Sequence, residues 1–238
     1  MKKYLMIFVM CLIFCLPAAV FAAPGYPEQL ELIAENADLW KQEMEYGQWG
    51  YTVTDLDLNG RLEIISASLQ GTGMYTYVQI FEVDPDGTAL IEIPQDRPDY
   101  ESAPDIMLET ASAFYDPESN LYYYIFTDFI RNGYAENYEN KRAVYLEEGI
   151  WKEIRLAQKA TIFSDIENFT VTFTDPEGKE ISEDVYENAE NTRFSGYEKG
   201  ILWLNWNMTD KETFAKTDKT ELRSSLENIS YSGPAESK

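Results

Sequence analysis

The chain has 238 residues, with 42 Asp or Glu against 19 Lys or Arg, and a formal net charge of −23 at pH 7. A field of this sign repels nucleic acid and anionic membrane surfaces, and it favours divalent cations and cationic partners. The chain contains no histidine, and its two cysteines are Cys11 and Cys15. Catalytic sites built on histidine and metal sites ligated by histidine are therefore excluded, which leaves paired carboxylates, a Ser–Lys dyad or a metal held by oxygen.

The N-terminus predicts a secretory signal peptide over residues 1–22. Two lysines open it, an apolar run follows from Tyr4 to Leu16, and small residues surround the expected cleavage site after Ala22. The apolar run is too short to span a bilayer comfortably. We therefore expect a secreted, extracytoplasmic protein without a membrane span. It should also lack a disulfide, because both cysteines leave with the signal peptide.

The mature chain is expected to open with an amphipathic helix over residues 28–46, where apolar side chains recur every three or four residues. Two strands follow, over 49–54 and 62–69, and an acidic stretch lies between them. In this stretch, residues 55–63, side-chain oxygens stand at positions 1, 3, 5 and 9 and Gly60 stands at position 6. Alternate oxygens of a tight loop can converge on a hard cation such as Ca²⁺, and glycine allows the positive φ of the turn. The alternative is a turn stabilised by its own Asp and Asn side chains, without a metal.

An EF-hand would require a glutamate at position 12 and a helix on each side, whereas position 12 is Ser66 and the flanks are predicted strands. The stretch instead resembles the D-x-D-x-[DN]-G-x-x-[DE] calcium loop of FG-GAP (integrin-type) repeats, in which the loop joins two strands. The chain is also similar to small secreted bacterial proteins of unassigned function that carry one such loop. The resemblance implies a Ca²⁺ ion bound by the side chains of Asp55, Asp57, Asn59 and Glu63 and by the backbone carbonyl of Arg61. Asn59 replaces the aspartate that is commoner in that family, which implies weaker binding.

The rest of the chain predicts mainly strands and hairpins with further helices. A polar connection with three prolines, residues 94–105, marks a candidate subdomain boundary, and residues 233–238 are expected to be a frayed tail. A helix is expected over 104–115, with Ser102 as its candidate N-cap and Asp105 three residues later. Further helices are expected after the N-cap Ser182 and after the N-cap Asp218. Strands are expected over 74–83, 88–93, 121–130, 142–147, 150–156, 169–174 and 201–208. The predicted fold is α+β, mainly antiparallel sheet, in a single domain over residues 23–232.

The function expected from these features is that of a monomeric, calcium-stabilised binding or interaction protein without catalytic activity, whose partner is a protein or a carbohydrate. One alternative is a carboxylate-dependent enzyme such as a glycoside hydrolase, which needs two acids. Glu147 and Glu148 are adjacent acids, but they fall in a predicted turn. The other alternative is a carbohydrate-binding module that uses aromatic faces. Its candidate aromatic residues are Trp151, Trp203, Trp206, Tyr122, Tyr123 and Tyr124.

Overall fold

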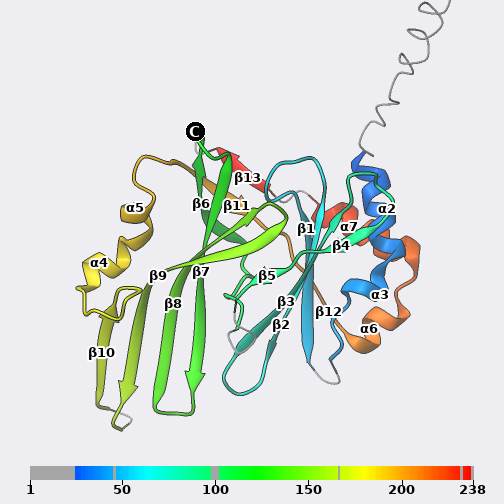
Figure 1. Ribbon diagram of the computed structural model, residues 1–238. Helices are drawn as coiled ribbons and strands as arrows, with labels where there is room; N and C mark the ends of the chain where they lie inside the picture. Colours follow the sequence, from blue (N-terminus) through cyan, green and yellow to red (C-terminus); the bar gives the residue numbers. More distant parts are fainter. Residues whose placement is uncertain (1–24, 45–46, 98–101, 166, 231–232, 237–238) are drawn as a thin grey trace, which may run out of the picture.

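The computed structural model describes residues 25–44, 47–97, 102–165, 167–230 and 233–236, so the expected signal peptide lies outside the described residues. Two β-sheets pack against each other through a shared core, and short helices lie on the outer side of each sheet (Figure 1). The fold is mostly β, and the α+β class expected from the sequence is wrong. Strands are longer than expected and helices are shorter, which changes the balance between the two.

The five-stranded sheet is antiparallel throughout and has the strand order β12-β1-β2-β3-β4. Its strand β1 lies between β12 and β2, and every residue of it from Trp49 to Thr54 is buried. Trp49, Tyr51 and Val53 point towards the helices, and Thr52 lies on the other face. The strands are β1 Gln48–Thr54, β2 Glu63–Gln70, β3 Tyr75–Val83, β4 Leu90–Glu92 and β12 Asn207–Asp210.

The second sheet has eight strands, with the order β10-β9-β8-β7-β6-β11-β13 and the short β5 parallel to β9. The long β8 and β9 are joined at Glu148 and Gly149, whose φ angles of 55° and 73° fit a tight hairpin turn that requires positive φ at both positions. The strands are β5 Gln95–Asp96, β6 Thr110–Asp116, β7 Leu121–Asn132, β8 Glu136–Glu147, β9 Ile150–Phe163, β10 Phe169–Thr174, β11 Glu198–Trp203 and β13 Gly233–Glu236.

Four helices cover the outer face of the five-stranded sheet, and two lie beside β9 and β10 of the other sheet (Figure 1). The first group is α2 Tyr26–Glu35, α3 Ala37–Trp40, α6 Lys211–Lys216 and α7 Lys219–Ile229, and the second is α4 Glu183–Glu187 and α5 Ala189–Arg193. The N-caps predicted at Ser182 and Asp218 are confirmed: the side chain of Ser182 accepts from the Val185 amide, and that of Asp218 accepts from the Glu221 amide.

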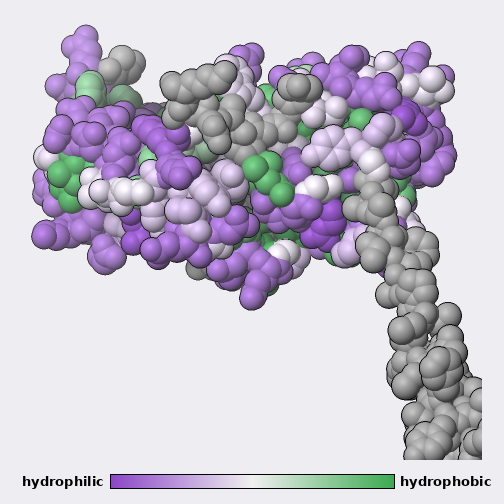
Figure 2. Space-filling model, turned by 90° about the horizontal axis from the view of Figure 1, so that it is seen from above, coloured by the Kyte–Doolittle hydropathy of each residue, from purple (hydrophilic) through white to green (hydrophobic). Residues whose placement is uncertain are grey.

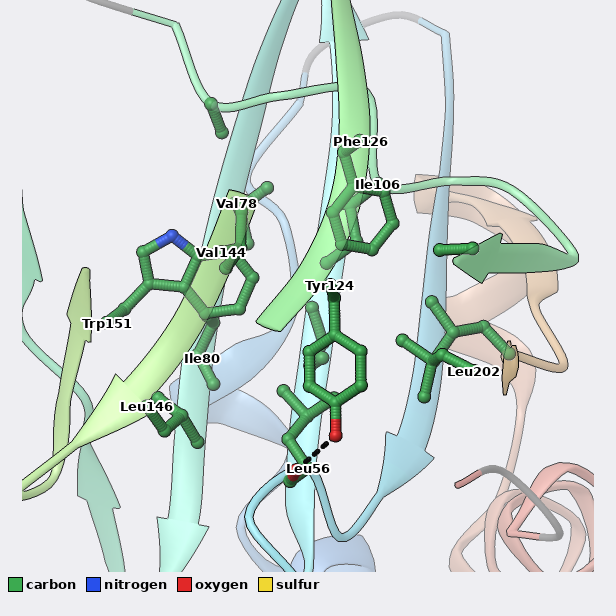
Figure 3. Close-up of a cluster of buried hydrophobic side chains, with 14 of the residues drawn as sticks. Leu56, Val78, Ile80, Ile106, Tyr124, Phe126, Val144, Leu146, Trp151 and Leu202 are labelled. Atoms are coloured by element: carbon green, nitrogen blue, oxygen red, sulfur yellow. Dashed lines mark hydrogen bonds between the residues drawn. The ribbon is translucent and has the colours of Figure 1, made fainter. Parts of the chain in front are cut away.

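The main core lies between the two sheets. Figure 3 shows Tyr124, Phe126 and Trp151 of the eight-stranded sheet in the same cluster as Val78 and Ile80 of the five-stranded sheet. A second apolar cluster lies between the five-stranded sheet and its helices, and a smaller one lies on the outer face of the eight-stranded sheet. Seen from above, the surface is dominated by hydrophilic residues (Figure 2). None of the helices in the described part of the chain is long and apolar enough to cross a membrane.

The helix predicted over 104–115 is wrong, because β6 occupies the second half of that range and pairs with both β7 and β11. Ala111 and Ala113 face the core between the sheets, whereas Phe114 faces the outer cluster, and this period of two identifies a strand. Ser102 does not cap a helix; its hydroxyl donates to the Asp128 carboxylate at 3.1 Å.

Three further differences reduce the helix content or redistribute the strands. The single helix expected over 28–46 is replaced by α2 and α3, and the helical segment ends at Lys41, whose backbone is extended. The strand expected over 201–208 is divided, because β11 belongs to the eight-stranded sheet and β12 to the five-stranded one. Residues 233–236, expected in a frayed tail, form β13 and pair with β11.

Candidate metal centre

The acidic stretch forms the connection between β1 and β2, at one end of the five-stranded sheet. Its turn contains two residues in the left-handed region, Leu58 with φ 55° and Gly60 with φ 84°. The Gly60 amide donates to Asp55 Oδ2 at 3.0 Å, so the first carboxylate of the stretch closes the loop over its sixth residue. The positive φ predicted for Gly60 is present, whereas that of Leu58 could not be read from its residue type.

Three of the predicted ligands come together. Asp55, Asp57 and Glu63 each present a carboxylate oxygen within 4.8 Å of the others. Glu63 is 0% exposed and Asp55 is 6% exposed, and Asp57 is half-buried. Three carboxylates at this separation repel one another unless a proton or a cation lies among them.

Two oxygens of this cluster have no hydrogen-bond donor in the described structure. Glu63 Oε2 accepts from the Leu56 amide at 2.7 Å, but Glu63 Oε1 is buried without a partner. Asp55 Oδ2 accepts from Gly60 and from the Tyr26 hydroxyl at 3.3 Å, but Asp55 Oδ1 is likewise buried without a partner. A buried carboxylate oxygen without a donor is costly, so this pair marks a position where a cation would be stabilising.

Burial is the largest cause of the raised pKa values of Glu63 and Asp55. It raises the pKa of Glu63 well above its usual range, and the charges of Asp57 and Asp55 raise it further, against the hydrogen bond from Leu56. Burial also raises the pKa of Asp55, against the hydrogen bond from Gly60. A bound divalent cation would reverse this effect, because it favours the ionised form of every neighbouring carboxylate.

Asn59 and Arg61, the other two predicted ligands, lie beside the cluster. The Asn59 amide donates from Nδ2 to Asp57 Oδ2 at 3.0 Å, and Asn59 Oδ1 accepts from the Arg61 backbone amide at 2.8 Å. The Arg61 guanidinium pairs with Glu82 at 2.8 Å. Asn59 therefore orients Asp57, and its side-chain oxygen is already engaged by Arg61.

Glu82 is a fourth acid at this site that the sequence analysis missed. It lies on β3 directly opposite Glu63 in the antiparallel register, it is 7% exposed, and it also accepts from Asn59 Nδ2 at 2.7 Å. Burial raises its pKa, whereas Asn59 and Arg61 lower it. The signal that could have found it is the β2–β3 hairpin register, because directly opposed residues place their side chains on the same face.

Residues far away in the sequence hold the loop in place. Gln29 of α2 bridges it, donating to the Gly60 carbonyl at 2.9 Å and accepting from the Leu62 amide at 2.7 Å. On the opposite side, the Tyr124 hydroxyl of β7 donates to the Leu56 carbonyl (Figure 3). The loop is thus bound to the helix layer and to the other sheet as well as to its own strands.

Four of the aromatic candidates from the sequence, Tyr122, Tyr124, Trp151 and Trp206, lie in or against the main core. Trp151 and Tyr124 are buried in the main core, and Trp206 is partly buried against it, whereas Trp203 is 49% exposed. Glu147 pairs with Lys152 at 2.6 Å, and Glu148 occupies the β8–β9 turn.

Comparisons of the chain with protein-family models, with curated protein sequences and with solved structures found no match.

Proposed function

We propose that this chain is a secreted binding or interaction protein whose fold is stabilised by a Ca²⁺ ion held in the β1–β2 loop. The observation that carries the proposal is the pair of buried oxygens without donors, Asp55 Oδ1 and Glu63 Oε1, within an acidic cluster. Calcium takes six to eight oxygen ligands in a flexible geometry, and carboxylates on both sides of one turn suit that requirement.

The choice of calcium over other cations rests on the chemistry of the ligands. The cluster offers carboxylate oxygens, and the chain has no histidine and no cysteine outside the expected signal peptide. Zinc and copper favour nitrogen and sulfur ligands, whereas hard cations favour oxygen. Mg²⁺ demands near-ideal octahedral geometry and releases its water reluctantly, so an irregular cluster of acids favours Ca²⁺.

A non-catalytic role is supported by the way the other buried acids are used. Asp128 and Glu153 both bind Arg142, with oxygen-to-nitrogen distances of 3.0 and 2.9 Å. Both carboxylates are therefore occupied by an internal ion pair, which leaves neither placed to attack or protonate a substrate. The carbohydrate-binding alternative has less support, because two of its candidate aromatic residues, Trp151 and Tyr124, lie in the core.

Thermal unfolding in EDTA and in calcium, for the wild type and two variants, tests the proposal. Calcium should raise the melting temperature of the wild type and leave Asp57→Ala unchanged, because Asp57 is a member of the cluster. Asp86→Ala is the matched control: it removes an exposed aspartate from the β3–β4 turn, so its response to calcium should equal that of the wild type. Identical melting of the wild type with and without calcium would refute the metal assignment, and titration calorimetry gives the affinity independently.

A further inference from the structure

A second site is indicated on the opposite side of the five-stranded sheet from the main core. The C-terminal end of α2, α3 and the junction of α6 with α7 surround a pocket of about 710 Å³. This volume is typical of small-ligand sites, which are mostly apolar with a few placed polar groups. The residues of the calcium loop do not line it, so the two sites are separate.

The inner wall of the pocket is apolar and aromatic. Met44, Trp49, Phe214 and Leu222 all contribute to its lining. The Phe214 ring lies 4.9 Å from the Trp49 ring and 5.5 Å from the Trp40 ring, centroid to centroid. A ligand with an apolar chain or ring would exchange water for these side chains, which favours binding.

One polar group of this wall has no partner. Trp49 is 1% exposed, and its indole Nε1 is buried without an acceptor in the described structure. The neighbouring Trp40 has no such deficit, because its indole N–H donates to the Ile33 carbonyl at 2.9 Å. A buried donor needs an acceptor, and because Trp49 lines the pocket, a ligand oxygen beside this residue would supply one.

The rim of the pocket carries charges of both signs, with Glu35, Asp38 and Glu43 as its acids and Lys41, Lys211 and Lys219 as its lysines. Lys41 pairs with Asp38 at 2.6 Å, and Lys219 lies 3.7 Å from Glu35. Lys211, which also lines the pocket, forms no ion pair with the part of the chain that the structure describes. This lysine lines the same pocket as the apolar wall, so it can pair with an anionic group of a ligand bound there.

We propose that this pocket binds a small apolar carboxylate, either aliphatic or aromatic. Its chain or ring would lie against Phe214 and Met44, and its carboxylate would pair with Lys211 and accept from the Trp49 indole N–H. The argument depends on the apolar lining, the indole without an acceptor and the lysine without an acid, and it is independent of calcium.

Titration calorimetry and ¹⁵N-resolved NMR of the purified protein test the proposal with four probes. Octanoate represents the aliphatic acids and 3-phenylpropionate the aromatic acids, and octanamide and 3-phenylpropanamide are their neutral controls. At least one acid should bind and shift the Trp49 indole N–H resonance, assigned with Trp49→Phe, while that of the core residue Trp151 stays in place. The corresponding amide should bind about tenfold or more weakly, because it lacks the charge that pairs with lysine. The acid that binds more tightly shows whether the pocket prefers an aliphatic or an aromatic carboxylate.

Two surface variants keep the test valid if Trp49→Phe fails to fold. Lys211→Met should weaken binding of the acid by about tenfold or more. Lys216→Met is the matched control: it changes a lysine of the same helix that lies outside the pocket lining and near Glu212, so the affinity should be unchanged. The proposal is overturned if neither acid binds, if acid and amide bind equally, or if Lys211→Met binds as the wild type does. Because the assay is run in EDTA as well as in calcium, its outcome is separate from that of the metal assignment.

Discussion

Replacing the most buried carboxylate of the loop should stabilise the protein in EDTA and remove its response to calcium. Glu63 is fully buried, and its Oε1 has no donor in the described structure. Glu63→Gln preserves the size of the side chain and an oxygen for the Leu56 amide. It also replaces the oxygen without a donor by an NH₂ group that can donate to a neighbouring carboxylate. In EDTA the variant should therefore be more stable than the wild type.

The magnitudes follow from burial and linkage. An unsatisfied buried acceptor costs about 1–3 kcal/mol. A gain of about 2 kcal/mol raises the melting temperature of a chain of this size by about 4–8 °C. For a Kd of about 0.1 mM and about 1 mM free calcium, the wild type gains about 1.4 kcal/mol, or about 3–6 °C. The variant should lose this response because it lacks a charged ligand.

Melting curves in EDTA and in calcium, followed by circular dichroism, give both quantities, and a pH series in EDTA adds an independent check. Burial raises the pKa of Glu63, so the folded state binds its proton more tightly than the unfolded state. The contribution of this group to the free energy of unfolding is therefore full below about pH 4.3 and is lost as pH rises through the raised folded pKa. Glu63→Gln should remove that decline. A variant that is less stable than the wild type in EDTA, yet still stabilised by calcium, would refute the reasoning.

Three further perturbations test other parts of the structure. The Asn59 side-chain amide donates to the carboxylates of Asp57 and Glu82, and Asn59→Asp replaces this amide by another carboxylate. The variant should therefore melt at a lower temperature in EDTA, and calcium should raise its melting temperature by more than it raises that of the wild type. Burial raises the pKa of Asp128 to about 6, against the attraction of Arg142. The contribution of Asp128 to the free energy of unfolding should therefore be full below about pH 4 and be lost as pH rises through about 6. Urea unfolding across that pH range should show this decline in the wild type and not in Asp128→Asn. Asp218→Ala removes the N-cap of α7 and should cost about 1 kcal/mol, or about 2–4 °C in melting temperature, whereas the same change at exposed Asp86 should cost little.

The loop and its flanking strands could be predicted because their determinants are local. Nine consecutive residues contain the three acids that converge, and the neighbouring strands lie close to the expected ranges. Glu82, Gln29 and Tyr124 could not be found in the same way. Each reaches the loop from another element, through strand register, helix docking or the packing of the second sheet.

The predicted α+β fold class was wrong because, in several segments, long-range pairing between strands overrides the local sequence pattern. Ser102 and Asp105 have the spacing of a helix capping box, but they bind across the fold instead. Ser102 donates to Asp128, and Asp105 accepts from the Phe129 amide at 3.0 Å. In β8 and β9, polar residues such as Asn140 and Gln158 extend the strands beyond the predicted ranges. They bind each other at 2.7 Å, a cross-strand partnership that a single strand does not reveal.

The anchoring of the loop determines how calcium would act on the whole protein. Gln29 connects the loop to α2, and Tyr124 connects it to the core between the sheets. Opening the loop therefore requires breaking contacts in both layers, so the loop should not unfold locally at low cost. A ligand that stabilises such a segment raises the free energy of global unfolding rather than that of a local fluctuation. Hydrogen exchange in calcium and in EDTA should accordingly show equal changes in protection for the slowest amides of β2, β3 and β7. Changes confined to residues 55–63 would show that the loop opens independently of the sheets.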